Sequence, residues 1–537
     1  MSEANAARSG RWTAVNRWGI RAAYLALVVW FGLVLVRFHD PEDGFNRLIM
    51  FGAKQGLPQL SDFKRLNFLL MHDGYGYDAQ YYAQIAMHPD LKDPELKTAV
   101  DSLAYRSRRI LFGWTAYALG WGDPARILAV YVLQNAIAWV ILAWLLLHWL
   151  PPVSWTNFFR WGGVLFCAGL CMSLRNALLD GPSLMLIALG VWLLDRNRKW
   201  LGIGVLALSG LAKETNLITG TALIKPEDRS WRALGRLALL AVLLAVPLAL
   251  WLIYIRVTVG SALDAGVRNF DWPLRAYFAT WKDAYEVMYR PYWFKMGQTV
   301  MVMMVALTTQ MLFFLLRWRP KEIWWRVGVS FAVLMVVLGP AVWEGYPGAA
   351  VRVLLPMQLA FNILVPRTRA WWLVLILGNV SALYSVNFLR PPAGSGYRVE
   401  GPAAVRTSED GREKVRVDFG PGWFDTEESS SSYWRWVPAD TGFTIINPRQ
   451  TSIKVRLSFY LGSVDHRMAK VLLGEKELWS GPTETQQKIE LPVLELPPGR
   501  TAFQIKTDRP PQVPTVPPGS TQVLAFALRN LRLQVEP

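Results

Sequence analysis

The amino-acid sequence predicts a polytopic α-helical membrane domain followed by an all-β domain. Of its 537 residues 53% are hydrophobic, and the long apolar runs all lie between Ile20 and Leu389. From Arg390 to Pro537 no apolar run is long enough to cross a bilayer, whose hydrocarbon core of about 30 Å needs about 20 residues of helix. The composition therefore divides the chain into a transmembrane domain, 1–390, and a C-terminal domain, 391–537.

The apolar runs of the first domain approach or reach the length of a membrane span once their flanks are added: Ala22–Val36, Ile127–Leu147, Leu237–Ile255, Val300–Leu316, Val329–Val342 and Trp371–Tyr384. We expect helices, because backbone groups in lipid must satisfy their own hydrogen bonds. Basic residues precede the first run, and no clear small-residue cleavage site follows it. We therefore expect a retained first helix and a cytoplasmic N-terminus.

The formal net charge of +17 does not indicate nucleic-acid binding, because the basic residues gather at helix ends. Basic short loops favour the cytoplasm, and four loops fit this rule: Asp195–Lys199, Lys225–Arg236, Arg317–Arg326 and Pro366–Arg369. Neighbouring cytoplasmic loops must be separated by an even number of crossings. The protein is thus expected to be a multi-pass protein of the plasma (inner) membrane.

The stretch between the first two of these loops has the length of one helix, which breaks the parity. We expect Trp200–Ala212 and Asn216–Ile224 to be two short helices that meet at the polar residues from Lys213 to Asn216. They would form a hairpin with its tip on the outer side, where charge is tolerated. The alternative is one helix with Lys213 and Glu214 paired internally. The hairpin gives about 11 segments and an extracytoplasmic C-terminal domain.

The C-terminal domain shows the period-two alternation of strands, separated by Gly, Pro and Asn turn signals. The strand candidates are Ser452–Tyr460, Lys488–Leu496, Thr501–Lys506 and Val523–Val535. Many short strands predict a β-sandwich, which we expect to be a jelly roll. The tryptophans of this domain either fill the core, which is favoured, or stack on sugar rings: Trp423, Trp434, Trp436 and Trp479.

Charged residues at membrane depth are costly and are therefore functional candidates. The first outer loop, about 38–124, contains Asp78 near the start of a helix that runs through Ala86, and three arginines before the next apolar stretch, Arg106, Arg108 and Arg109. Asp78 is either functional or an N-cap. The arginines bind a phosphate, or they form a solvated basic face or contact lipid head groups.

Other candidates come from later segments that the topology places on the same outer side. Asp180 precedes a Gly-Pro pair that opens a helix, Lys213 and Glu214 lie at the hairpin tip, and Arg352 lies where a late helix begins. The alternatives are helix capping for Asp180 and a snorkelling anchor for Arg352. Carboxylates and cations from separate helices suggest a shared polar cavity. A carboxylate can accept a proton from a hydroxyl, and cations can stabilise a departing phosphate.

Four short motifs resemble those of the GT-C superfamily of membrane glycosyltransferases, which use polyprenyl-phosphate-linked sugars. They are Tyr77–Tyr82 in the first outer loop, Asp180 in the second, Leu211–Thr215 and Arg352–Pro356. The resemblance covers about Ile20–Leu389. It implies a bacterial-type GT-C fold in the plasma membrane, with an appended β-sandwich domain.

The resemblance also implies roles for individual residues. In an inverting transfer, Asp78 would be the base, Asp180 and Glu214 would orient the reacting groups, and the donor phosphate would bind Arg109, Lys213 and Arg352. Asp40, which stands closer to the first helix, is the alternative base. Supporting roles fall to His72, Asp73 and Tyr82. No second acid stands two residues from Asp78 to form a metal-binding pair, and participation of a divalent cation, Mg²⁺ or Mn²⁺, is left open.

The expected partners are a polyprenyl-phosphate-linked sugar, an acceptor that is a glycan, a lipid or a protein, and membrane lipids, but no nucleic acid. Two other functions are compatible with a polar outer cavity. A glycolipid transporter or flippase would show internal repeats and polar residues near the midplane, and the sequence has no convincing repeat. A non-catalytic membrane protein that displays a sugar-binding domain would require neither Asp78 nor Asp180.

Overall fold

The computed structural model describes residues 3–39, 44–52, 56–66, 68, 70–71, 75–228, 230–260, 266–289, 294–344, 348–391, 396–400, 415–420, 422–428, 432–483, 488–513 and 523–536. The chain forms two compact units. The helical unit comprises Met1–His39 and Tyr81–Pro391, and the β unit comprises Asp40–Gln80 and Pro392–Pro537. The two units are described separately.

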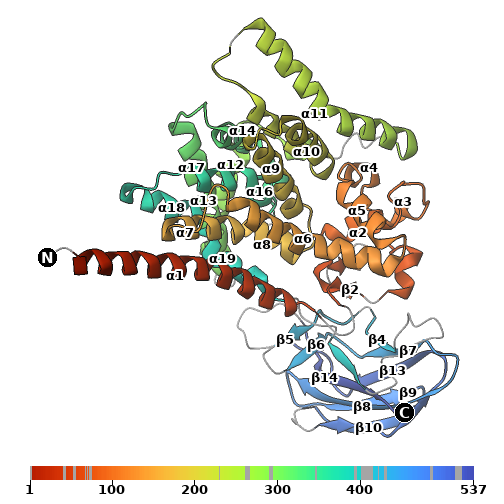
Figure 1. The fold of residues 1–537 in the computed structure, drawn as a ribbon. Coiled ribbons are helices and arrows are strands. Elements are labelled where there is room, and N and C mark those ends of the chain that lie inside the picture. Colours follow the sequence, from red (N-terminus) through yellow and green to blue (C-terminus); the bar gives the residue numbers. More distant parts are fainter. Residues whose placement is uncertain are drawn as a thin grey trace. The chain divides into compact units, whose positions relative to one another are not determined.

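The helical unit contains long apolar helices (Figure 1). Over the described residues, five segments are long and apolar enough to cross a membrane: Arg17–Val36 of α1 (Glu3–Val36), α6 (Pro124–Leu146), α11 (Trp231–Thr258), α13 (Phe294–Leu316) and Arg369–Leu389. The last comprises η5 (Arg369–Trp371), α18 (Trp372–Asn379), α19 (Ser381–Ser385) and η6 (Val386–Leu389). A sixth span is possible if α7 (Trp155–Leu165) and α8 (Ala168–Arg175), bent by 45°, count as one. The prediction of a helical unit with several helices long and apolar enough to cross a membrane is thereby confirmed.

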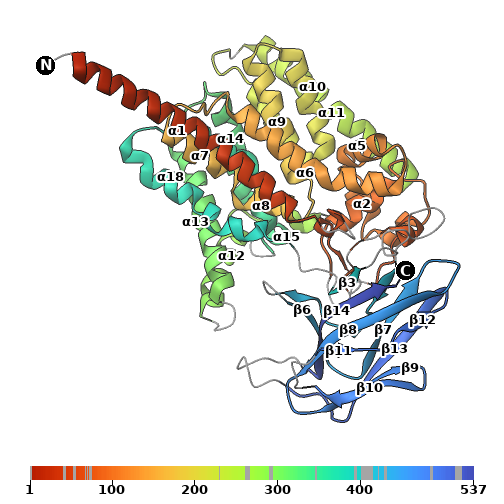
Figure 2. The ribbon, with the colours of Figure 1, turned by 60° about the horizontal axis from the view of Figure 1, so that its bottom comes forward.

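The stretch between α9 (Asp180–Asp195) and α11 consists of two short helices, as expected. The α-helix α10 (Lys199–Ala212) ends at Lys213, whose backbone is extended (φ −162°, ψ 126°), and the 3₁₀ helix η3 (Glu214–Leu223) follows. The two helices pack together, because Asn216 Nδ2 donates to Ser209 O at 3.0 Å and Leu217 lies against Gly210. The alternative of one uninterrupted helix is wrong. Helices α6, α9 and α10 lie side by side (Figure 2).

The predicted run Val329–Val342 is divided between α14 (Ile323–Val337) and α15 (Pro340–Trp343). The cause is a close backbone approach at Gly339, whose N–H donates to Asn269 O at 2.7 Å, and the bridge between Leu338 and Phe270. A Cβ at Gly339 would lie 2.4 Å from Arg268 O. Helices α16 (Gly348–Val353) and α17 (Leu355–Leu364) follow and are also short.

The first outer loop contributes four short helices: α2 (Ala79–Met87), α3 (Leu96–Ala99), α4 (Leu103–Arg106) and α5 (Leu111–Gly120). The predicted helix through Ala86 is therefore confirmed. Between α11 and α13 lie η4 (Val267–Asn269) and α12 (Arg275–Met288). The remaining elements of this loop, which belong to the β unit, are η1 (Asn46–Leu48), β1 (Phe51–Gly52), η2 (Ser61–Arg65) and β2 (Leu70–Met71), with β1 parallel to β2.

The C-terminal strands form two sheets. One has the order β10 (Lys476–Pro482), β9 (Met468–Leu473), β13 (Gly499–Thr507), β7 (Thr441–Asn447) and β4 (Arg416–Asp418). The other has the order β11 (Ile489–Glu490), β8 (Ile453–Ser463), β14 (Phe526–Val535), β6 (Tyr433–Val437) and β5 (Glu427–Glu428), with β12 (Leu494–Leu496) on β8 and β3 (Tyr397–Glu400) on β14.

Alternate residues of both sheets meet in one apolar core, which includes Val455, Leu457, Phe443 and Phe503. Each strand hides one face because successive side chains point to opposite sides. Trp423 is part of this core and donates from Nε1 to Gly442 O at 2.8 Å. Trp423 therefore fills the core, whereas Trp434, Trp436 and Trp479 are only half-buried.

Candidate active site

Asp180 is the centre of a buried ion cluster in the helical unit. It begins α9, and only 7% of its surface is exposed. Its Oδ1 accepts a hydrogen bond from Lys213 Nζ, and its Oδ2 accepts one from Arg352 Nη1 at 2.9 Å. Charged groups in a protein interior are retained when they are paired and hydrogen-bonded. Asp180 therefore joins three elements that are far apart in the sequence, α9, the α10–η3 junction and α16.

The turn that presents Asp180 is held by polar side chains of α6 and α8. Asn135 Nδ2 donates to Leu178 O at 2.6 Å, and Ser173 Oγ donates to Asn135 Oδ1 at 2.9 Å. Ser173 Oγ also accepts the N–H of Gly181 at 2.8 Å. These bonds satisfy backbone groups that the turn before α9 leaves without helical partners. The carboxylate is consequently fixed at the helix N-terminus, where negative charge is stabilised.

A neutral hydrogen bond lies beside the ion pair between Asp180 and Lys213. Asn216, in the first turn of η3, donates from Nδ2 to Ser183 Oγ at 2.6 Å. Asp180 and Ser183 stand three residues apart on α9 and therefore share one helical face. The same two segments are thus joined by an ion pair and, next to it, by a neutral hydrogen bond.

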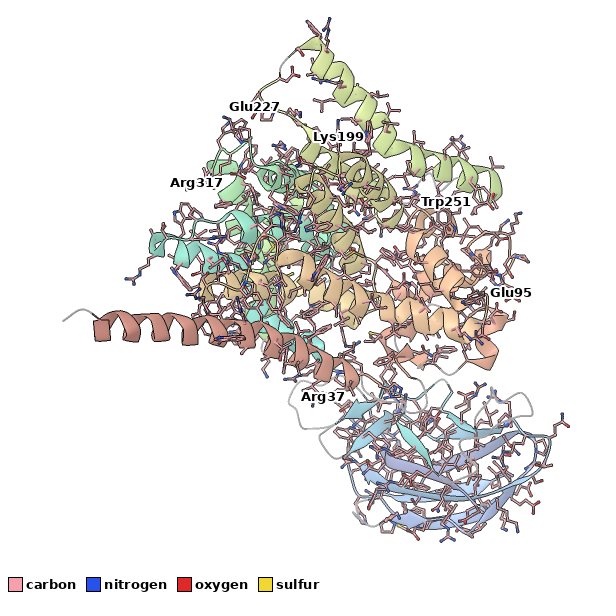
Figure 3. The ribbon with its side chains drawn as sticks, in the orientation of Figure 1. Arg37, Glu95, Lys199, Glu227, Trp251 and Arg317 are labelled. Atoms are coloured by element: carbon pink, nitrogen blue, oxygen red, sulfur yellow. The ribbon has the colours of Figure 1, made fainter. Side chains whose placement is uncertain are left out.

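Arg109 forms the second half of the site. Its Nε donates to Glu214 Oε2 at 3.0 Å, and its Nη1 donates to Tyr82 OH at 2.9 Å. The backbone before Arg109 is fixed by α11, because Trp251 Nε1 donates to Ser107 O at 2.7 Å; Figure 3 labels Trp251 on α11. Tyr82 lies on α2, so Arg109 connects the outer-loop helices with η3.

The two halves of the site lie within electrostatic reach of each other. Lys213 interacts with both Arg109 and Arg352, and Glu214 interacts with Arg108 as well as with Arg109. Among the described residues the cluster contains four cations, Arg108, Arg109, Lys213 and Arg352, and two carboxylates, Asp180 and Glu214. Cations that outnumber carboxylates at a partly buried site favour the binding of an anion.

The structure thus brings together Tyr82, Arg109, Asp180, Lys213, Glu214 and Arg352. Asp78 is half-buried and immediately precedes α2, but it belongs to the β unit. Asp40, His72 and Asp73 lie outside the described residues. Arg352 does not extend away as a surface anchor, since its side chain is 11% exposed and its Nε donates to Gly348 O at 3.0 Å.

Sequence reasoning missed the residues that hold this cluster in place, namely Asn135, Ser173, Ser183 and Asn216. The available signal was the presence of small polar residues within apolar helices, where a polar group needs a partner. Among the described residues, no group of three or more His, Cys, Asp and Glu side chains could hold a metal ion.

No protein-family model matches this chain, and no curated protein sequence matches it either. The geometry of the site indicates its chemistry. Arg109 uses Nε and Nη1 in its two side-chain bonds, which leaves Nη2 without a partner among the described residues. Arginine and lysine donors arranged in this way can bind phosphate oxygens. The paired carboxylates fix the cations in position rather than supply the ligand charge.

Proposed function

We propose that the protein is a membrane glycosyltransferase that moves a sugar from a polyprenyl-phosphate donor to an extracytoplasmic acceptor with inversion. The observation that supports this function best is the cluster around Asp180, Lys213, Arg352, Glu214 and Arg109. Its arginine and lysine donors suit a phosphate that becomes dianionic as it leaves. Stabilisation of developing charge by fixed donors is usually the largest contribution to catalysis.

In this proposal Asp78 accepts the proton of the acceptor hydroxyl. The hydroxyl oxygen forms a bond to the anomeric carbon of the sugar, and the bond from that carbon to the phosphate oxygen breaks. Polyprenyl phosphate departs and is stabilised by Arg109, Lys213 and Arg352. Asp180 and Glu214 keep these cations oriented, and Tyr82 supports Arg109. The base is assigned to Asp78 from the motif in which it stands.

The finer features of the fold belong to the same proposal. We assign about 11 membrane segments in a GT-C-like arrangement, a cytoplasmic N-terminus in the plasma membrane and an extracytoplasmic C-terminal domain with jelly-roll topology, following the charge distribution of the loops. Either Mg²⁺ or Mn²⁺ is compatible with this function. The acceptor is a glycan, a lipid or a protein.

The first experiment is native mass spectrometry of the protein extracted from its own membrane, which identifies a co-purified polyprenyl phosphate or its glycosylated form. Turnover of that donor is then measured as release of polyprenyl phosphate. We expect Asp78→Asn to reduce turnover by about 10²–10⁴-fold, the usual contribution of a general base. Binding of the donor should remain.

Asp123→Asn is a matched control. Asp123 caps α6 and accepts the N–H of Arg126 at 3.0 Å. Asparagine caps helices about as well as aspartate, so Asp123→Asn removes a carboxylate charge beside a helix N-terminus while the cap remains. Unchanged turnover in Asp78→Asn would refute the assignment of the base. Movement of the donor across the bilayer without sugar transfer would instead identify a flippase, and absence of any polyprenyl-phosphate binding would favour the non-catalytic alternative.

A further inference from the structure

The segment between α11 and α13 carries a row of exposed aromatic residues that the proposed function does not use. Phe278, Tyr285 and Tyr289 are 61%, 55% and 71% exposed. Phe278 and Tyr285 lie on α12, and Tyr289 directly follows its last residue. Residues at positions i, i+7 and i+11 of a helix project in nearly the same direction. We call this row the aromatic stripe.

The opposite side of α12 faces protein. Ala276, Tyr277 and Ala284 are buried, and Ala276, Thr280 and Val287 line a cavity of about 370 Å³ between α12, α13 and α15. The helix therefore has one side directed into the unit and one side with aromatic rings directed outward. Figure 2 shows α12 next to α13.

Backbone and side-chain bonds hold this helix firmly. Leu274 N–H donates to Val336 O at 2.6 Å, Asp271 N–H donates to Val337 O at 3.1 Å, and the Tyr277 hydroxyl is hydrogen-bonded to Thr308 Oγ1 of α13 at 2.8 Å. Tyr277 also packs edge-on against Trp343, with ring centroids 5.9 Å apart. These bonds fix the first turns of α12, and the buried Ala284 continues the contact with the unit toward its end.

The position of α12 in the chain limits what the stripe can meet. It lies between two segments that are long and apolar enough to cross a membrane, α11 and α13. The link between two successive spans emerges at one membrane surface. Helix α12 has only 14 residues and carries Arg275, Lys282 and Glu286 on its exposed side, so it is too short and too charged to cross. It therefore belongs to the part of the chain that emerges at one membrane surface.

We infer that α12 lies in the membrane interface and that the aromatic stripe inserts among the lipid head groups of the leaflet it faces. Tyrosine and tryptophan are enriched at this depth because their rings are apolar and their O–H and N–H groups remain hydrated. Amphipathic helices lie in the interface plane with the apolar side in lipid. Trp272 and Phe270, 76% and 59% exposed, extend the aromatic surface to the residues before the helix. Lys282 and Arg275 can contact lipid phosphates from the same side.

The inference rests on α11 and α13 as spans and does not require glycosyl transfer. It is tested with the full-length protein in phospholipid nanodiscs. Cys167 and Cys171 are buried, so a cysteine introduced at an exposed site can be labelled selectively with a nitroxide. Phe278→Cys and Tyr285→Cys probe the stripe, and Lys476→Cys, at an exposed position of β10, is the control for a label in water.

Collision of each nitroxide with oxygen, which concentrates in lipid, is compared with collision with a water-soluble nickel chelate. We expect oxygen to dominate at 278 and 285 and the nickel chelate to dominate at 476. A label at 285 that behaves like the one at 476 would place the stripe in water and overturn the inference. Protection of 278 and 285 from both reagents would mean that a protein surface, such as a second copy of the chain, covers the stripe, and this would overturn it as well.

Discussion

The helical unit contains two buried polar clusters of opposite character. The charged cluster joins Asp180, Lys213 and Arg352 with Arg109 and Glu214. The amide cluster consists of uncharged side chains, Gln310 on α13, Gln358 and Asn362 on α17, and Asn379 on α18. Both occur where helices pack, and both hold together elements that are distant in the chain. They differ in whether their hydrogen-bond donors are used up within the described part of the protein.

In the amide cluster every side-chain nitrogen donates to a protein oxygen. Gln358 Nε2 donates to Gly163 O at 3.0 Å and to Asn379 Oδ1 at 2.7 Å. Asn379 Nδ2 donates to Asn362 Oδ1 at 2.9 Å, and Gln310 Nε2 donates to Gly378 O at 2.7 Å. A network whose donors are all satisfied stabilises packing and has little left for a ligand.

In the charged cluster, four cations stand beside two carboxylates among the described residues. Arg109 there retains a donor group, Nη2, beyond its two side-chain bonds. Burial of polar groups therefore does not by itself indicate a binding site. An arrangement in which cations outnumber carboxylates at a fixed geometry does favour one, because it attracts an anion.

The largest effect on stability is expected from Asp180→Asn in the charged cluster. The substitution removes the negative charge that Lys213 and Arg352 share, and two buried cations then repel each other. Removing one partner from a buried ion pair typically destabilises a protein by about 3–5 kcal/mol. We expect a loss of that order in the free energy of unfolding, together with loss of donor turnover. Thermal unfolding in detergent and the release of polyprenyl phosphate measure the two effects.

Asp228→Asn provides the comparison at the surface. Asp228 forms an ion pair with Arg236, whose side chain is 65% exposed. Exposed pairs contribute about 0–1 kcal/mol, so this variant should unfold nearly as the parent does. Equal destabilisation by the two substitutions would show that the Asp180 cluster is not buried in the protein in solution.

A smaller effect is expected for Gln358→Leu in the amide cluster. The substitution leaves Gly163 O and one acceptor site of Asn379 without their donor and deprives Gln310 of the acceptor oxygen of Gln358. A buried polar group without a partner costs about 1–3 kcal/mol. Thermal stability should fall by that order while turnover per folded molecule is unchanged. A selective loss of turnover would instead give the amide cluster a functional role.

Part of this organisation follows from the sequence. The helix break at Lys213 was predicted because loop charge required an even number of crossings and four polar residues interrupted an apolar run. Strands β8, β13 and β14 followed from period-two alternation, which is a local property. The list of charged candidates followed from the cost of charge at membrane depth.

The pairing of these residues was not predictable. Asp180 meets Arg352 across 172 positions of sequence, and only the packing of α8, α9 and α16 decides that they are partners. The amide cluster was missed for a related reason, because a lone Gln or Asn in an apolar helix has no local pattern that identifies its partner. The division of Val329–Val342 at Gly339 depends on contact with residues 268–270, which lie far upstream.

The smallest effect is expected from Arg108→Gln, which tests how the charged cluster contributes to the binding of polyprenyl phosphate. Arg108 is half-exposed, lies over the Tyr105 ring at 5.3 Å and acts electrostatically on Glu214. Among the described residues it has no carboxylate within ion-pair distance. A partly exposed charge contributes about 0.5–1 kcal/mol to the binding of an anion, or about a two- to fivefold change in affinity.

Arg108→Gln should therefore weaken binding of polyprenyl phosphate by this modest factor and leave thermal stability unchanged. The dependence of binding on salt concentration should also become shallower, because screening acts on exposed charges. Arg106→Gln is the matched control, since Arg106 is paired with Asp101 through Nη2 at 2.7 Å and its charge is already compensated. Equal loss of affinity in both variants would show that the phosphate responds to the summed positive charge of Arg106, Arg108 and Arg109 and not to the individual position of Arg108. A loss of affinity confined to Arg108→Gln would show that Arg108, as part of the charged cluster, contributes to phosphate binding.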